Sequence, residues 1–203
     1  NQLKNVDVTP RNKEQRFALE ALCDPNIPLV TLTGIAGSGK TFLALMSALE
    51  SIFSSKTNDK RIVVTRSIQP VGRDIGFLPG DLEDKMSPWM SPLIDNFRHH
   101  FKDLTYFETL REKGVIEIAP LSFIRGRTFN DAVVIVDEAQ NASIHELKTV
   151  ITRIGKNAKV VLLGDTDQID TPYIDKRSNG LSIVVEKFQS SRLAAHVHLD
   201  KGE

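Results

Sequence analysis

The sequence predicts an α/β fold, in which a parallel β-sheet is covered by helices on both faces. Stretches with the composition of strands alternate with stretches of helical periodicity along the whole chain. Several strand-like stretches are apolar at every position, including 132–136 and 160–163, which is typical of parallel strands buried on both faces. A length of 203 residues allows one sizeable domain, so we expect residues 1–203 to form a single domain.

The first half of the chain opens with a polar stretch, 1–10, which we interpret as a linker remnant. Apolar residues recur at helical spacing in 11–22, and Pro25 and Pro28 end that helix. Polar residues at 54–59 predict a turn, and the glycines and prolines of 67–85 predict a loop. The regular elements expected in this half are helix 11–22, strand 29–33, helix 42–49, strand 61–65 and a helix over 88–101.

The second half repeats the same alternation of strands and helices. Its strands are short apolar runs rich in valine and isoleucine, and its helices carry apolar residues three and four positions apart. The expected elements are helix 106–113, strand 115–119, strand 132–136, helix 144–154, strand 159–163, helix 180–189 and strand 195–199.

The composition limits the classes of function that are open. The 26 basic and 26 acidic residues balance, so a nucleic-acid site must be a local patch or be completed by other subunits. The single cysteine, Cys23, excludes an intrachain disulfide and a cysteine-based metal site. There is no membrane-length apolar run and no signal peptide, so we expect a cytoplasmic location. The chain does not begin with Met, and we interpret it as a domain of a longer protein.

The most specific motif is G-x-x-x-x-G-K-T at 34–41, between an expected strand and an expected helix. In that context glycines let several backbone N–H groups point at one phosphate chain, and the following helix contributes its positive end. Lys40 can reach the terminal phosphates, and the Thr41 hydroxyl can bind Mg²⁺. A chance glycine-rich turn is the alternative. The expected nucleotide-binding residues are Gln15, Gly34, Ile35, Ala36, Gly37, Ser38, Gly39, Lys40, Thr41 and Phe42.

Two further motifs point to hydrolysis. Asp137 and Glu138 follow the strand 132–136, and the carboxyl ends of parallel strands are where ligands bind in such sheets. We expect Asp137 to hold Mg²⁺, and Glu138 to orient or deprotonate the attacking water. The alternative for Glu138 is an ordinary surface acid. The next buried strand leads to Gln168, whose amide can bond both the γ-phosphate and the water.

The choice of base depends on Gln15. A glutamine amide carries a donor and an acceptor, so it can pair with N6 and N7 of adenine. The alternative is a plain exposed glutamine on a helix. No N-K-x-D or T-K-x-D motif follows the glycine loop, and its absence argues against guanine. The sequence therefore predicts ATP, with Mg²⁺, as the ligand.

Together, N-x-x-Q, G-x-A-G-S-G-K-T, V-D-E-A-Q-N and G-D-x-x-Q-I-D resemble the first domain of superfamily-one helicases, and more closely the PhoH-like ATPases. Segments that sharpen the match are 64–66, 76–82, 88–90, 124–127, 151–155, 170–173 and 178–181. P-W-M, S-N-G-L and the ending H-V-H-L-D-K-G-E resemble the form fused to a PIN ribonuclease domain. Ile35 departs from the family pattern, in which proline is usual.

The resemblance implies a three-layer, RecA-like P-loop core without a second helicase domain. A lone core needs a cation from a neighbouring subunit, so the family expectation is a homo-oligomeric ring, commonly a hexamer. Four arginines in motif-like segments are candidates for contacting the γ-phosphate or RNA, with surface salt bridges as the alternative for each. They are Arg66, Arg125, Arg127 and Arg153.

The resulting hypothesis is an ATPase that acts as an RNA helicase or translocase module with a PIN nuclease domain. Single-stranded RNA would contact basic residues beside aromatic ones, in 72–77 or 98–102, although a solvated helix face has the same composition. An ATP-controlled assembly switch is the alternative function. A small-molecule kinase is a third, which the water-activating pattern of Glu138 and Gln168 argues against.

Overall fold

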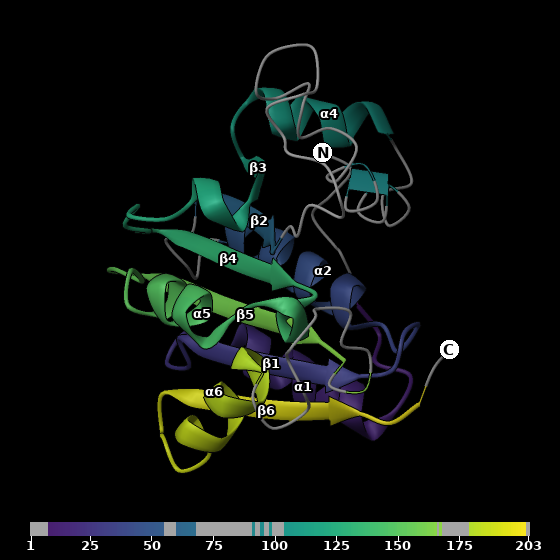
Figure 1. Cartoon of the computed structure of the whole chain (residues 1–203). Coiled ribbons are helices and arrows are strands. Elements are labelled where there is room, and N and C mark those ends of the chain that lie inside the picture. The colour runs from purple at the N-terminus through teal and green to yellow at the C-terminus, as the bar shows by residue number, and fades with distance from the viewer. Residues whose placement is uncertain are drawn as a thin grey trace.

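The computed structural model describes residues 8–54, 60–67, 91, 94–95, 98, 104–165, 167 and 179–201 (Figure 1). In these residues, helices and strands alternate as the sequence predicts. The α-helices are α1 (Lys13–Cys23), α2 (Lys40–Phe53), α4 (Leu104–Glu112), α5 (Ile144–Ile151) and α6 (Gly180–Phe188), and the short 3-10 helices are η2 (Leu121–Phe123) and η3 (Ala139–Asn141). The strands are β1 (Leu29–Gly34), β2 (Arg61–Arg66), β3 (Ile116–Pro120), β4 (Ala132–Asp137), β5 (Ala158–Gly164) and β6 (Ala194–Leu199).

The six strands form one parallel sheet with the order β3-β2-β4-β5-β1-β6. Strand β1 therefore lies between β5 and β6, which come much later in the chain. Because all the strands run the same way, their carboxyl ends gather at one edge of the sheet, which we call the carboxyl edge. Residues 34, 66, 137 and 164 end their strands there.

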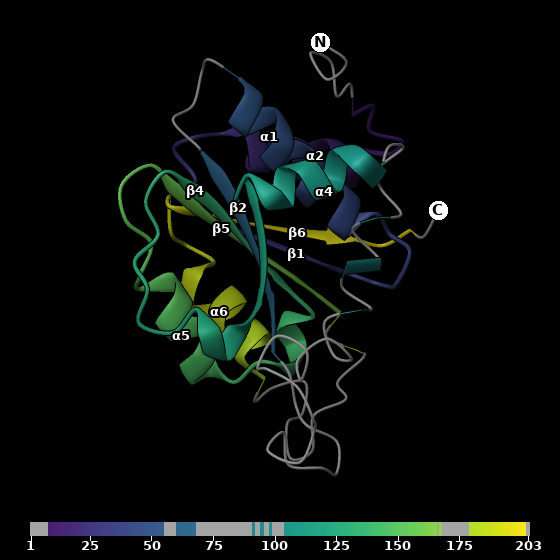
Figure 2. The ribbon, with the colours of Figure 1, turned by 90° about the horizontal axis from the view of Figure 1, so that it is seen from above.

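Helices cover both faces of this sheet (Figure 2). Helices α1, α2 and α4 lie on one face, and α5 and α6 lie on the other. Each face has its own buried cluster: Val30, Leu32 and Leu45 belong to the first, and Val134 and Leu147 to the second. Alternate residues of each strand point to opposite faces. The predicted three-layer α/β fold is confirmed.

Local signals in the sequence fix the ends of several helices. The Asn12 side chain accepts a hydrogen bond from the Gln15 N–H and begins α1. Ser143 and Glu146 form a reciprocal capping box at the start of α5, a pairing that satisfies two otherwise free N–H groups. The Asn179 side chain accepts a hydrogen bond from the Ser182 N–H and begins α6.

The expected boundaries differ from the observed ones by a few residues. Helix α2 begins at Lys40 rather than at 42, and α5 ends at Ile151 rather than at 154. Of the helix expected over 88–101, residues 91, 94, 95 and 98 are described, and they are helical. The expected turn 54–59, loop 67–85 and arm 1–10 lie mostly outside the described residues. Among the described helices, none has the length and apolar composition to cross a membrane.

Candidate nucleotide-binding and hydrolytic site

The glycine-rich loop joins β1 to α2 at the carboxyl edge of the sheet. Gly37 and Gly39 have φ angles of 77° and 87°, a left-handed conformation that glycine adopts without steric cost. A Cβ atom added at Gly37 would meet no atom within 4 Å. The loop therefore curls back on itself while leaving space beside its backbone, as a phosphate cradle requires.

Gly34 has a different reason to be glycine. Its φ is 143°, and a Cβ atom there would lie 2.3 Å from the carbonyl oxygen of Leu199. The carbonyl belongs to the last residue of β6, which pairs with β1 in register. The end of β6 thus packs directly against the start of the glycine loop, and no side chain fits between them.

Lys40, the first residue of α2, folds back over the loop. Its Nζ atom donates hydrogen bonds to the carbonyl oxygens of Gly34 and Ile35 at 2.6 and 2.7 Å, and it lies 3.3 Å from Ser38 Oγ. Burial lowers the pKa of Lys40, while the negative charges of Asp165, Glu138 and Asp137, in that order, act to raise it. The loop therefore holds a cation whose nearest acids lie on two neighbouring strand ends.

Asp137 ends β4 on the face of the sheet that carries α2. It continues the row of Val133 and Ile135, which pack in the cluster beneath α2, because alternate strand residues share a face. Its side chain is almost fully buried, and burial raises its pKa to about 6, against the opposing effect of the Arg66 guanidinium 3.8 Å away. The charged form of a buried, poorly hydrated carboxylate is stabilised by a bound cation.

Glu138 lies one residue further, in a strained conformation. Its φ and ψ are 49° and 42°, the left-handed region, which is uncommon for a residue other than glycine and tends to occur at functional sites. Its side chain is 37% exposed, accepts a hydrogen bond from the Gln140 amide, and lies 3.4 Å from Arg66. Glu138 is therefore a partly exposed acid with two side-chain partners, Arg66 and Gln140.

Sequence reasoning did not assign a role to Asp165, although it is among the acids closest to the loop lysine. Asp165 follows β5 on the row of Val161 and Leu163, beneath α2, and is 7% exposed. Among the carboxylates it has the strongest charge interaction with Lys40. The part of the signal that the sequence carries is an aspartate shortly after the buried strand 160–163, two positions after Leu163. Gln168, the predicted γ-phosphate sensor, lies outside the described residues.

Gln15 is buried rather than exposed, so the alternative of a plain surface glutamine is wrong. Its side chain is 3% exposed. The Oε1 atom accepts a hydrogen bond from the Arg11 N–H at 2.9 Å, and Nε2 lies 3.4 Å from the carbonyl oxygen of Ser38. The amide therefore connects the start of α1 to the glycine loop.

The four candidate arginines lie at two different edges of the sheet. Arg66 ends β2 beside the acid pair, and Arg125 lies 4.0 Å from Glu146 in the first turn of α5. Arg127 pairs in bidentate fashion with Glu117 of β3, with one N–O distance of 2.8 Å, and stacks over the Phe129 ring.

Glu117 is the second residue of β3, near the amino end of that strand and so towards the edge of the sheet opposite the glycine loop. Arg153 follows α5 at that same opposite edge, where its carbonyl oxygen accepts from the Phe129 N–H. The structure thus brings Arg66 to the acids of its own chain, and it keeps Arg127 and Arg153 away from them.

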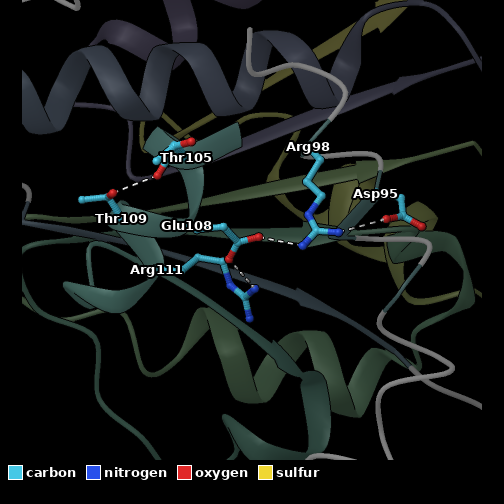
Figure 3. Close-up of polar contacts among 6 residues, drawn as sticks. All are labelled: Asp95, Arg98, Thr105, Glu108, Thr109 and Arg111. Atoms are coloured by element: carbon cyan, nitrogen blue, oxygen red, sulfur yellow. Dashed lines mark hydrogen bonds and ion pairs between the residues drawn. The ribbon is translucent and has the colours of Figure 1, made fainter. Parts of the chain in front are cut away.

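Of the residues considered for RNA contact, 72–77 and 99–102 lie outside the described part of the chain. Arg98 is described, and acids surround its guanidinium (Figure 3). It lies 2.6 Å from Glu108 and 3.8 Å from Asp95, and Glu108 also pairs with Arg111. The hydrogen bond from Arg98 lowers the pKa of Glu108. The positive charge of Arg98 is therefore shared with carboxylates of its own chain.

The residues present fit a magnesium nucleotide. The described chain contains no cluster of three or more histidine, cysteine, aspartate or glutamate side chains that would enclose a metal. Mg²⁺ does not require such a cluster, because it commonly keeps several waters and binds one or two carboxylates together with phosphate oxygens. Asp137 and the Thr41 hydroxyl, in the first turn of α2, are the residues that would supply such donors.

Comparison with known proteins identifies relatives for nearly the whole chain. The family model described as PhoH-like protein matches residues 7–203. Protein PhoH2 of Bacillus subtilis is 46% identical, over 97% of this chain and 45% of that protein. A PhoH-like protein of the same organism is 40% identical, over 85% of this chain and 53% of that protein.

The chain spans about half the length of these relatives. Among solved structures, the crystal structure of Pif1 helicase from Candida albicans aligns with a TM-score of 0.47 at 17% identity, over 97% of this chain and 41% of that one.

Proposed function

Since the chain belongs to the PhoH-like protein family, we propose that it binds ATP and hydrolyses it with the help of Mg²⁺. The observation that carries this proposal is the position of Asp137, Glu138 and Asp165 at the ends of the neighbouring strands β4 and β5, at the same edge of the sheet as the glycine loop that follows β1; their charges act on the pKa of Lys40 in that loop. Acids from two adjacent strand ends facing a glycine loop match the arrangement in which P-loop enzymes hold a metal and a triphosphate.

In this proposal the backbone of 34–39 and the Lys40 ammonium bind the phosphates. Lys40 exchanges its present bonds to the carbonyl oxygens of Gly34 and Ile35 for phosphate oxygens. Thr41 and Asp137 hold Mg²⁺, which when bound neutralises phosphate charge. Charge-assisted contacts of this kind supply most of the catalysis in phosphoryl transfer.

Glu138 is proposed to orient the water. The water oxygen attacks the γ-phosphorus, the bond from that phosphorus to the β,γ-bridging oxygen breaks, and the water proton passes to solvent or to phosphate. The products are ADP and inorganic phosphate. Gln168 is proposed to contact both the γ-phosphate and the water, as in other hydrolytic P-loop enzymes.

Gln15 is proposed to select adenine. Its amide already contacts the Ser38 carbonyl of the loop, so it lies close enough to the phosphate cradle to link base recognition to loop geometry. Replacing Gln15 by Ala should reduce the preference for ATP over GTP. If both nucleotides weaken equally, Gln15 acts only as a brace for the loop.

Two substitutions test the ATPase proposal directly. Lys40→Ala should abolish nucleotide binding, measured by titration of a fluorescent ATP analogue. Glu138→Gln should bind ATP normally but lose at least about 100-fold in turnover, since a neutral amide oxygen is a weaker hydrogen-bond acceptor than a carboxylate and orients the attacking water less well. Wild-type turnover in Glu138→Gln would remove Glu138 from the mechanism.

The wider role that we propose is an RNA helicase or translocase module, working as a hexameric ring with a PIN nuclease domain in the cytoplasm. It is supported by the family and by an active site whose described part offers no second lobe to cover the nucleotide. Sedimentation with and without an ATP analogue tests assembly, and turnover with single-stranded RNA tests coupling. ATP-dependent assembly without RNA stimulation would favour the assembly switch instead, and a phosphorylated small molecule would favour a kinase.

A further inference from the structure

We propose that Gln140 is a positioning residue for hydrolysis: its side-chain amide holds the Glu138 carboxylate and ties it to the backbone of Asp165. This inference rests on the proposed ATPase function. It adds a role for a residue that the proposed mechanism did not use. The two side-chain hydrogen bonds of Gln140 join it to Glu138 and Asp165 rather than to the nucleotide loop. Its proposed effect passes entirely through the residue that orients the water.

The Gln140 side chain itself lies inside the protein. Gln140 is 0% exposed. Its Nε2 atom donates a hydrogen bond to Glu138 Oε2, and its Oε1 atom accepts one from the Asp165 N–H at 3.1 Å. One side chain therefore connects the turn after β4 to the turn after β5, the two turns that carry the acids around Lys40.

A glutamine is the side chain that suits both contacts. The carboxylate of Glu138 needs a donor, and the N–H of Asp165 needs an acceptor, and a glutamine amide provides both. Glutamate at 140 would keep the acceptor and lose the donor, and it would add a negative charge beside Glu138. Leucine would keep a similar volume and lose both contacts, leaving a buried N–H without its partner.

The packing around the amide shows that its place is closely defined. A Cβ atom on Gly164, the residue that ends β5, would lie 2.7 Å from Gln140 Oε1 and 2.5 Å from a methyl group of Leu181. Only a glycine at 164 lets the amide approach the end of β5 this closely. The amide oxygen therefore lies directly against the end of β5, away from solvent.

This support acts on a residue whose other side-chain contact is a partly exposed ion pair, with Arg66 at 3.4 Å. Glu138 is itself 37% exposed, and partly exposed ion pairs contribute little to stability, so the hydrogen bond from Gln140 is the contact that fixes the carboxylate. Catalytic groups lose much of their effect when they are misplaced by about 1 Å. Without Gln140, the carboxylate should spend only a fraction of its time where the attacking water is bound.

The experiment measures single-turnover ATP hydrolysis and ATP-analogue affinity for the wild type, Gln140→Leu and Gln140→Glu. Both variants should lose about 10- to 100-fold in the rate of hydrolysis, with affinity within about threefold of the wild type. Gln140→Glu keeps the acceptor for the Asp165 N–H, so it remains informative if Gln140→Leu folds poorly. The matched control is Asn130→Ala, which removes a side-chain bond to the Lys156 N–H at the opposite edge of the sheet and should leave hydrolysis unchanged.

A double-mutant cycle with Glu138→Gln separates positioning from a structural role. If Gln140 acts through Glu138, adding Gln140→Leu to Glu138→Gln should change the residual rate by less than about twofold, because the group that it positions has already been disabled. Equal losses in both backgrounds, or a parallel loss of affinity and rate, would overturn the proposal.

The same measurements distinguish a failure of the Gln140 proposal from a failure of the ATPase proposal. Normal hydrolysis in both Gln140 variants, with Glu138→Gln inactive, would overturn the role of Gln140 alone. A wild-type protein that binds but does not hydrolyse ATP would overturn the ATPase proposal, and the role of Gln140 with it.

Discussion

Replacing Gly34 and Gly37 by alanine should damage the protein in two different ways, although both glycines belong to the same loop. A methyl group at Gly34 would lie 2.3 Å from the Leu199 carbonyl oxygen, about 1 Å closer than an ordinary contact allows. Backbone strain of about 1–3 kcal/mol and overpacking of a similar size together predict a loss of about 2–6 kcal/mol in the free energy of unfolding. A methyl group at Gly37 meets open space, so only its left-handed conformation is penalised, by about 1–2 kcal/mol.

Urea unfolding of the two variants and the wild type, without nucleotide, measures these losses. Titration with an ATP analogue should then show weakened binding for Gly37→Ala, because the methyl group occupies space beside the phosphate cradle. Nucleotide-free Gly34→Ala should already be the less stable protein of the two. If Gly34→Ala loses no more stability than Gly37→Ala, then the end of β6 does not support the loop as closely as the structure indicates.

Three further predictions concern the charged groups. Asp137→Asn should stabilise the nucleotide-free protein at pH 8 by up to about 3 kcal/mol, because burial raises the pKa of the carboxyl to about 6 and so opposes its ionisation. Urea unfolding measures this gain in stability, which should be smaller at pH 5. Glu117→Gln should lower stability at pH 7 by about 0.5–1 kcal/mol. Arg127 holds the pKa of Glu117 below its usual range, so this contribution is present above the unfolded pKa and is lost as the pH falls below 4; equal losses at pH 3 and pH 7 would contradict it. Arg66→Ala should reduce ATP turnover while Arg127→Ala leaves it unchanged, because only Arg66 reaches Asp137 and Glu138; steady-state kinetics of the two variants decide.

The sheet and the phosphate loop followed from the sequence because their signals are local. The apolar strand 132–136 and the glycine spacing of 34–41 each point to one structure without reference to distant residues. The position of Asp137 could also be predicted, because an acid that ends a buried parallel strand must lie at the carboxyl edge of the sheet.

The remaining parts of the site depend on tertiary pairing. Asp165 and Gln140 gain their roles because β5 lies beside β4, and no local pattern shows that an amide from one turn bonds the backbone of the next. Gln15 is buried because α1 packs near the loop, whereas its helix alone resembles any amphipathic surface helix. Arg127 and Arg153 match motif-like segments. The edge of the sheet at which they lie depends on the path of the folded chain, which the neighbouring residues in the sequence do not reveal.

The position of β1 between β5 and β6 bears on how the protein is made. During synthesis the residues of the glycine loop leave the ribosome before either of the strands that flank β1, because β5 and β6 both follow it in the chain. A nascent chain that ends before 158 can form neither neighbour of β1, and one that ends before 199 lacks the carbonyl oxygen beneath Gly34. Because pairings between distant segments form slowly, nucleotide binding should be acquired only after residue 199 has left the ribosome.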